Sequence, residues 1–179
     1  MKFKKGSNGG VAVELGPEET RFTVLQGPLP AFRLKKIMVP VDFSECSNKA
    51  IQYAVPFAKQ FGAEVVLLHL VEPYPQVPEM APIDIENLQD AKKQMEACRR
   101  ASCSISVKTL VRVGEATTGI IEAAKELDID LIILSTHGRT GVARVFLGST
   151  AERVVRLAPC PVLVVRERER DFVAEANDK

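Results

Sequence analysis

"KKIMVPVDFSE", residues 35–45, joins a short apolar run to a polar segment that can start a helix. The run over residues 37–41 predicts a buried strand, and Ser44 is a residue type that favours a helix N-cap. Apolar residues then recur at helical spacing over residues 47–61, and Gly62 stands where a glycine commonly ends a helix. The stretch therefore predicts a strand followed directly by a helix, which is the repeating unit of an α/β fold.

The alternation of strands and helices continues along the chain. "EVVLLHLVE", residues 64–72, is a continuous apolar run, typical of a parallel strand that helices cover on both faces. Prolines interrupt regular structure over residues 72–82. The later segments predict a polar helix (residues 85–100), an edge or near-edge strand (104–114) and a helix (115–130). A strand (131–135), a helix (149–157) and a last strand (160–166) follow. Right-handed crossovers between the strands predict a five-stranded, open parallel sheet with helices on both faces.

Both ends of the chain differ from this predicted domain, which spans residues 34–167. Within the N-terminal extension, residues 1–33, "VAVELGPEETRFTVL" predicts a strand, a turn and a strand, and therefore a small β-hairpin. Residues 168–179 form a highly charged tail, which we expect to be solvated or loosely helical.

Composition limits the classes of protein that the chain can represent. The 179 residues are 46% hydrophobic and 26% charged, which predicts one soluble globular domain with a substantial core. The net charge of +1 provides no overall field to attract nucleic acid or an anionic membrane, so we expect neither as a partner. No apolar run approaches the roughly 20 residues of a membrane span, and the first residues lack the apolar core of a secretory signal. The expected location is therefore the cytoplasm.

The cysteines do not predict a metal centre. Cys46, Cys98, Cys103 and Cys160 form no CxxC pair, and the chain has only two histidines to join them. Zinc sites need closely spaced thiolate and imidazole ligands. We therefore expect reduced thiols with structural roles.

A glycine-rich loop, "LSTHGRTGVARVFLGSTAE" at residues 134–152, follows the fourth predicted strand. Gly138 allows a tight turn, and Gly148 allows a ligand to approach the backbone closely. Ser149 and Thr150 supply hydroxyl and N–H groups where a helix begins. In an open α/β sheet, ligands bind beyond the carboxyl ends of the strands, near the point where the winding direction reverses. The loop therefore predicts a phosphate site; glycines that serve only to turn the chain are the alternative.

Several catalytic motifs are absent from the sequence. It contains no GxxxxGK[ST] phosphate loop, no GxGxxG dinucleotide fingerprint and no GxSxG nucleophile elbow. His137 lies near Ser135, but the sequence places no acid to orient it, and we interpret it as a residue that caps the loop. His69 lies inside an apolar strand, and we interpret it as a core histidine with a satisfied hydrogen bond.

Four segments in this order, residues 35–45, 64–72, 131–155 and 158–165, resemble the universal stress protein family. The family implies a flavodoxin-like fold with strand order 3-2-1-4-5, usually as a dimer. In its nucleotide-binding branch, ATP is held by a loop of the form Gly-x2-Gly-x9-Gly-[Ser/Thr]. The three glycine positions of that motif fall on Ser135, Gly138 and Gly148, so a serine replaces the first glycine.

The resemblance also implies roles for residues at the strand ends. Asp42 matches a position that contacts the ribose or adenine, and the backbone of Leu70 matches one that meets the adenine. Arg139 is a candidate charge partner for the phosphates. Magnesium or manganese would bind through the phosphates, because no carboxylate pair adjoins the loop. The predicted nucleotide-binding residues are Pro40, Val41, Asp42, Leu70, Ser135, Gly138, Arg139, Gly148, Ser149 and Thr150.

We therefore expect a universal stress protein that binds ATP and reports nucleotide state to an unidentified protein partner. Without an evident base or arginine–lysine clamp, we expect at most weak ATP hydrolysis. The apolar last strand, "PVLVV", leaves an open edge, and we expect a homodimer through it. The alternative is a dimeric interaction protein of the same fold that binds no nucleotide, which Ser135 keeps open. A third hypothesis is a small hydrolase that uses Ser135 or Ser149 with His137.

Overall fold

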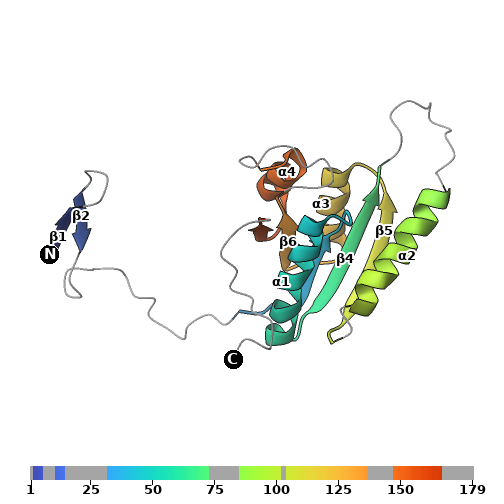
Figure 1. Cartoon of the computed structure of the whole chain (residues 1–179), viewed down its shortest axis with the longest axis horizontal. Coiled ribbons are helices and arrows are strands. Elements are labelled where there is room, and N and C mark those ends of the chain that lie inside the picture. Colours follow the sequence, from blue (N-terminus) through green and yellow to red (C-terminus); the bar gives the residue numbers. More distant parts are fainter. Residues whose placement is uncertain are drawn as a thin grey trace. The chain divides into compact units, whose positions relative to one another are not determined.

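A computed structural model describes residues 2–5, 11–14, 32–72, 85–101, 104–136 and 147–166 of the chain. The chain divides into two compact units, Met1–Phe32 and Arg33–Lys179. In the first unit, β1 (Lys2–Lys5) pairs antiparallel with β2 (Val11–Glu14) (Figure 1). β2 lies in the predicted strand "VAVEL", but its partner is β1. The expected partner, "RFTVL", lies outside the described residues.

The second unit is an open sheet of five parallel strands in the order β5-β4-β3-β6-β7. Counted from β3, this is the predicted order 3-2-1-4-5, and β5 lies at an edge, as expected. No helix among the described residues is long and apolar enough to cross a bilayer. The elements are β3 (Lys36–Pro40), α1 (Glu45–Phe61), β4 (Glu64–Val71), α2 (Ile85–Ala101), β5 (Val107–Val113), α3 (Ala116–Glu126), β6 (Leu131–Ser135), α4 (Ser149–Leu157) and β7 (Val162–Val165).

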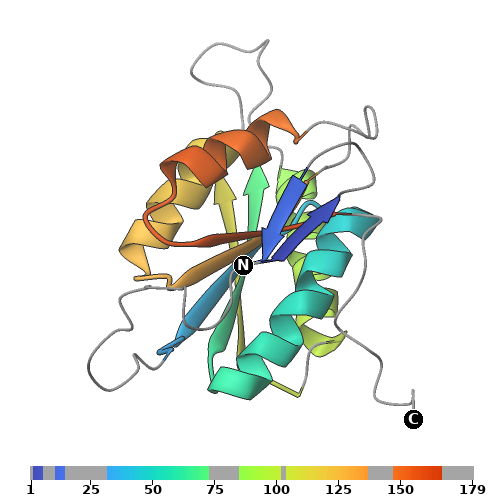
Figure 2. The ribbon, with the colours of Figure 1, turned by 90° about the vertical axis from the view of Figure 1, so that its left-hand side faces the viewer.

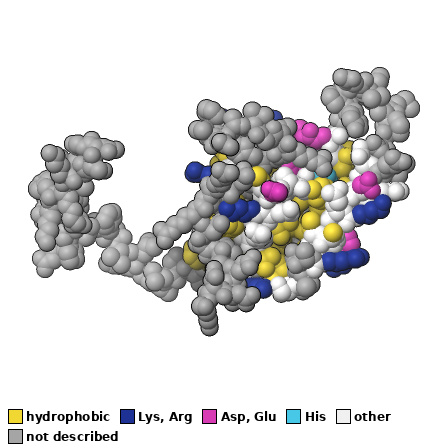
Figure 3. Space-filling view, viewed as in Figure 1, with side chains coloured by type: hydrophobic (Ala, Val, Ile, Leu, Met, Phe, Trp, Pro, Cys, Tyr) yellow, Lys and Arg dark blue, Asp and Glu magenta, His cyan; other side chains and the backbone are white. Residues whose placement is uncertain are grey.

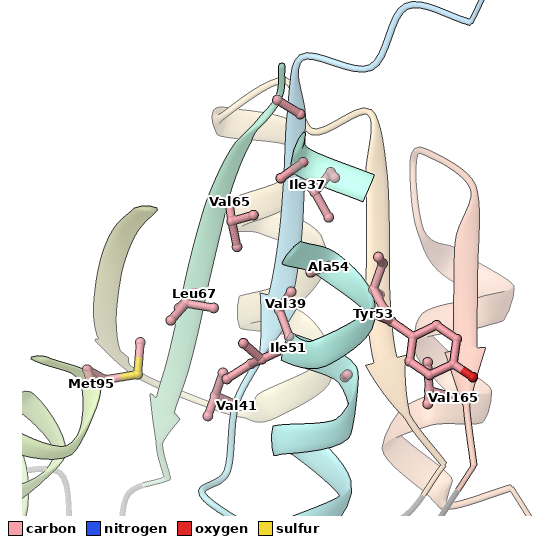
Figure 4. Packing of buried hydrophobic residues seen from close by; sticks show 14 residues of the cluster. Ile37, Val39, Val41, Ile51, Tyr53, Ala54, Val65, Leu67, Met95 and Val165 are labelled. Carbon is pink, nitrogen blue, oxygen red and sulfur yellow. The ribbon is translucent and has the colours of Figure 1, made fainter. Parts of the chain in front are cut away.

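Helices cover the sheet on both faces: α1 and α2 lie on one side, and α3 and α4 on the other (Figure 2). Side chains of the central strand β3 alternate between the two layers. Ile37 and Val39 join the core under α1, whereas Met38 joins the core under α3 and α4. Figure 4 shows the first of these cores, and Figure 3 shows a band of hydrophobic surface on the face that carries α1 and α2. The side chains of Ile37, Met38 and Val39 are fully buried, as a parallel strand covered on both faces requires.

A single carboxylate aligns the amino ends of β3 and β6. Asp130 Oδ2 accepts hydrogen bonds from the backbone N–H groups of Lys35 (2.7 Å) and Lys36 (2.9 Å). The Asp130 N–H group donates to the Lys36 carbonyl at 3.0 Å. The two strands therefore start at the same level, which fixes where their carboxyl ends lie relative to each other.

Three of the helices that flank β3 begin in different ways. The Ser44 hydroxyl caps α1 by accepting from the Ser47 N–H at 3.2 Å. Glu115 caps α3, and its hydrogen bonds with Thr118 lower the pKa of the Glu115 carboxyl to about 2. Within the described part of the chain, no side chain caps α4, which starts after Gly148.

Gly148 attaches the start of α4 to the end of β6. Its N–H donates to the Thr136 carbonyl at 2.9 Å, and a Cβ at Gly148 would lie only 2.8 Å from that same oxygen. Thr136 cannot move away freely, because its own N–H donates to Val165 of β7 at 3.0 Å. The φ of −58° at Gly148 suits any residue, so the close backbone contact, rather than the dihedral angle, requires glycine. The sequence context of Gly148 predicts close approach of a ligand, whereas its close neighbour in the structure is Thr136.

We expect Gly148→Ala to lower the free energy of unfolding by about 1–3 kcal/mol, the usual cost of forcing an extra carbon into a packed site. Urea denaturation followed by circular dichroism measures this change. Ser149→Ala is the matched control, because Ser149 is exposed and α4 gains no side-chain cap from it; we expect a change of less than about 0.5 kcal/mol. Equal stability of Gly148→Ala and the wild type would show that the contact with Thr136 does not require glycine.

Candidate functional site

The pairing of β3 with β6 ends before the carboxyl ends of the two strands. These strands pair only at Ile37–Leu131 and Met38–Ile132, although β3 continues to Pro40 and β6 to Ser135. The neighbouring pair β6–β7 stays in register as far as Ser135–Val165. The gap in pairing is therefore local to the β3–β6 boundary.

Pro40 explains why the β3–β6 ladder stops. The N–H of the next residue, Val41, donates to Leu68 of β4 at 2.8 Å. Because successive residues of a strand direct their polar groups to opposite sides, the nitrogen of Pro40 faces β6. Proline has no N–H, so it cannot donate the next bond of that ladder. The chain also reverses its winding direction at this boundary, which is where open α/β sheets bind ligands.

A tight turn after β3 presents Asp42 at this edge. Asp42 is partly exposed, and its Oδ1 accepts from the Ser44 hydroxyl at 2.6 Å and from the Ser44 N–H at 3.1 Å. Phe43, between them, has a φ of +66°, an uncommon value for a bulky residue. Val41 anchors the turn from below, because its side chain is only 4% exposed in the core. The turn therefore holds a carboxylate in a defined place beside the gap.

The end of β4 contributes residues to both faces of the sheet. Leu70 packs against the core under α3, where a Cβ at Gly119 would collide with it. Its side chain is thus committed to packing, which leaves its backbone for the predicted adenine contact. His69 is partly buried and its Nδ1 lies 2.6 Å from the Val41 carbonyl. The expected satisfied hydrogen bond is present, but it reaches the Asp42 turn, a connection that the apolar context of His69 did not indicate.

The end of β6 and the start of α4 lie together at the same carboxyl edge. Thr136 is 7% exposed and joins the two elements through its bond with Gly148. Ser149 and Thr150 are exposed in the first turn of α4. A helix N-terminus carries a partial positive charge and N–H donors, which favour anions. The carboxyl edge of the sheet therefore carries both a carboxylate acceptor and a donor-rich helix start, a combination suited to a ligand with both hydroxyl and anionic groups.

Two predicted nucleotide contacts, Gly138 and Arg139, lie outside the described residues. His137, which we interpret as a residue that caps the loop, lies outside them as well. The structure brings the remaining predicted nucleotide contacts to the carboxyl edge of one sheet. They are Pro40, Val41, Asp42, Leu70, Ser135, Gly148, Ser149 and Thr150.

The thiols and acidic groups of the described residues form no further centre. No group of three His, Cys, Asp or Glu side chains in these residues is placed to hold a metal ion. Cys46, Cys98 and Cys160 are free and partly buried, whereas Cys103 is not among the described residues. Burial raises the pKa of Cys98, and burial together with the charge of Asp130 raises that of Cys160, so both thiols are poor nucleophiles at neutral pH.

Comparison with known proteins places this fold in a family. A model of the Universal stress protein family matches residues 33–166. Universal stress protein MJ0531 of Methanocaldococcus jannaschii is 35% identical over 144 residues, covering 76% of this chain and 85% of that protein. The universal stress protein UspA from Lactobacillus plantarum superposes with a TM-score of 0.69 at 32% identity, covering 76% of this chain and all of that one. A universal stress protein from Archaeoglobus fulgidus, solved in complex with dAMP, matches with a TM-score of 0.58 at 20% identity, covering 74% of this chain and 98% of that chain. The chain belongs to the universal stress protein family.

Proposed function

We propose that this universal stress protein binds an adenine nucleotide, with ATP as the expected ligand, in the gap between β3 and β6. The observation that carries the proposal is the early end of the β3–β6 ladder, at an edge of the sheet that also carries Asp42 after β3 and the start of α4 after β6. Asp42 would accept a hydrogen bond from the nucleoside. Ser149 and Thr150 would hold phosphates through hydroxyl and N–H groups. Magnesium or manganese would then bind through the phosphates.

The relative from Archaeoglobus fulgidus supports this choice of ligand, because it was solved with an adenine mononucleotide. At 20% identity it shares the fold with this chain, so the residues that would bind the nucleotide here are argued from this structure alone. A protein that binds a nucleotide without efficient hydrolysis can signal the nucleotide level to a partner. We propose such a sensing role, with a protein partner still to be identified.

Ser135 replaces a motif glycine, but its position on β6 makes it compatible with phosphate binding. Leu134 packs in the core under α3 and α4, and Ile133 in the core under α1. Since strand side chains alternate, Ser135 points to the α1 face, away from the layer that contains α4. The extra Cβ is therefore not directed at the proposed phosphate position.

Isothermal titration with ATP, ADP, AMP and adenosine in the presence of Mg²⁺ tests the proposal. We expect saturable ATP binding by the wild type, and we expect Ser135→Gly to change the ATP affinity by no more than about threefold, or ~0.6 kcal/mol. Native mass spectrometry of the purified protein provides an independent check for nucleotide carried through purification. If neither form binds ATP or adenosine at millimolar ligand, the nucleotide function is wrong and the interaction module that binds no nucleotide is favoured.

Asp42→Asn isolates the nucleoside contact. The asparagine carbonyl can still accept the hydrogen bonds from Ser44 that hold the turn, but the negative charge and one acceptor are lost. We expect adenosine to bind more weakly by about 1–3 kcal/mol, the usual loss for a hydrogen bond to a charged group. Adenosine is the right probe because it is uncharged, so removal of a carboxylate does not change a repulsion with phosphates.

Ser44→Ala is the control for the Asp42 experiment. It removes the hydroxyl that donates to Asp42 and caps α1 but keeps the Ser44 N–H bond to Asp42, and we expect it to cost about 1 kcal/mol of stability. Its adenosine affinity should fall less than that of Asp42→Asn. Unchanged adenosine binding by a folded Asp42→Asn variant would remove Asp42 from the site.

We also propose that the protein forms a homodimer through the open edge of β7. Among the described strands, β7 has a neighbour only on its β6 side. The adjacent helix α4 exposes Val155 (46%) and Leu157 (54%), which supply apolar surface near this end of the fold. An exposed apolar edge strand invites pairing with another strand, and a second copy of the same edge satisfies it symmetrically.

Val164→Pro tests this dimer without breaking the sheet. The carbonyl groups of Pro161 and Val165 accept bonds from β6, so the polar groups of Val164, one residue out of phase, face the open edge. We expect proline there to shift the protein toward monomer in light scattering at tens of micromolar, because it removes an outward donor. Leu163→Pro is the contrasting variant. The N–H of Leu163 faces β6, so loss of this donor should destabilise the fold. A wild type that is monomeric at this concentration would contradict the proposed dimer.

A further inference from the structure

His69 contacts both residues that flank Asp42 in the chain. Its Nδ1 lies 2.6 Å from the Val41 carbonyl, and its ring centroid lies 4.4 Å from that of Phe43, with the rings tilted by 36°. A carbonyl oxygen can only accept, so Nδ1 carries the hydrogen of this bond. One side chain from β4 thus holds the turn that follows β3 at two points.

The bond from His69 replaces a missing backbone bond. The β3–β4 ladder continues as far as the Val41 N–H, which donates to the Leu68 carbonyl at 2.8 Å. In a continued parallel ladder the next acceptor would be the Val41 carbonyl, and its donor would be the N–H of Leu70. In the described structure the imidazole Nδ1 of His69 donates a hydrogen bond to the Val41 carbonyl instead. An aliphatic side chain would fill the same space without satisfying this oxygen.

The turn needs such support because its conformation is strained. Phe43 has a φ of +66°, a region that a bulky L-residue keeps only where its surroundings hold it. The side chain of Val41 is buried in the core, near Ile51 of α1 (Figure 4). The Ser44 hydroxyl holds Asp42 Oδ1 through a hydrogen bond. His69 holds two further groups of the turn, the Val41 carbonyl and the Phe43 ring.

We propose that His69 is a positioning residue for the nucleoside: by holding Val41 and Phe43, it keeps Asp42 where it can accept a hydrogen bond from the ligand. This inference rests on the proposed nucleotide function. His69 itself is not assigned a contact with the ligand, and it acts through the turn. The interpretation of His69 as a residue of the core alone is the competing view, and it predicts that any replacement of similar size serves equally well.

Two substitutions separate the donor from the ring. His69→Asn places an amide N–H₂ close to the position of Nδ1 and removes the ring, whereas His69→Phe keeps a ring against Phe43 and removes the donor. We expect His69→Phe to weaken adenosine binding at least fivefold and His69→Asn to bind within about threefold of the wild type, because the donor holds the carbonyl beside Asp42. Ile120→Val, in the core on the opposite face, is the control for general loss of stability; its adenosine affinity should be unchanged.

The rate of hydrogen exchange at the Ser44 amide, followed by NMR, measures how firmly the turn is held in the absence of ligand. This N–H donates to Asp42 Oδ1, so a loosened turn should speed its exchange in His69→Phe but not in His69→Asn or Ile120→Val. Long-range ¹H–¹⁵N spectra of the wild type should also show hydrogen on Nδ1 of His69.

The two readouts distinguish failure of this inference from failure of the proposed function. If the wild type binds adenosine and His69→Phe binds it equally well with unchanged Ser44 exchange, the positioning role is overturned. If the wild type binds neither ATP nor adenosine, the nucleotide function fails and with it the nucleoside part of this inference. Ser44 exchange then decides whether His69 holds the turn: faster exchange in His69→Phe supports that role, and unchanged exchange overturns it.

Discussion

Complete burial of the three middle residues of the central strand β3 is the constraint on which the rest of the structure depends. Ile37, Met38 and Val39 are fully buried, and they point alternately into two cores. A strand of this kind needs a neighbour on each edge and helices on each face, because no side of it can meet water. The positions of β4 and β6 beside β3, and of the helix pairs above and below, satisfy this requirement.

The same strand creates the candidate site where it ends. Pro40 removes the donor that would continue the ladder to β6, so the pairing ends at the point where the winding of the sheet reverses. The chain then makes a strained turn at Phe43 rather than a further strand residue. Strain of this kind is common at binding sites, where surrounding contacts maintain it. Here the contacts come from Ser44 on one side and His69 on the other.

Two residues show why the site was harder to predict than the fold. Gly148 suggested a ligand that approaches the backbone, but the nearest atom to its missing Cβ belongs to Thr136, which explains the glycine without a ligand. His69 suggested an ordinary core residue, but its bond to the Val41 carbonyl ties it to the turn that carries Asp42. In both cases a contact within the protein accounts for the residue type. The partner that constrains each residue lies in another segment of the chain, Thr136 after β6 and Val41 after β3, so no local pattern could name it.

The sequence by itself determined the order and type of the elements from residue 36 onward, since apolar spacing and cap residues such as Ser44 and Gly62 are local signals. It also determined which residues follow the strands, and therefore which side chains could share one edge of a parallel sheet. Only the tertiary structure decided how far β3 and β6 pair, and thus where the sheet opens. The extent of pairing depends on the register between two segments far apart in the chain. Asp130 sets this register at the amino ends of the strands, and Pro40 ends the pairing toward their carboxyl ends. Register is a property of contacts between strands, and neither strand contains it alone.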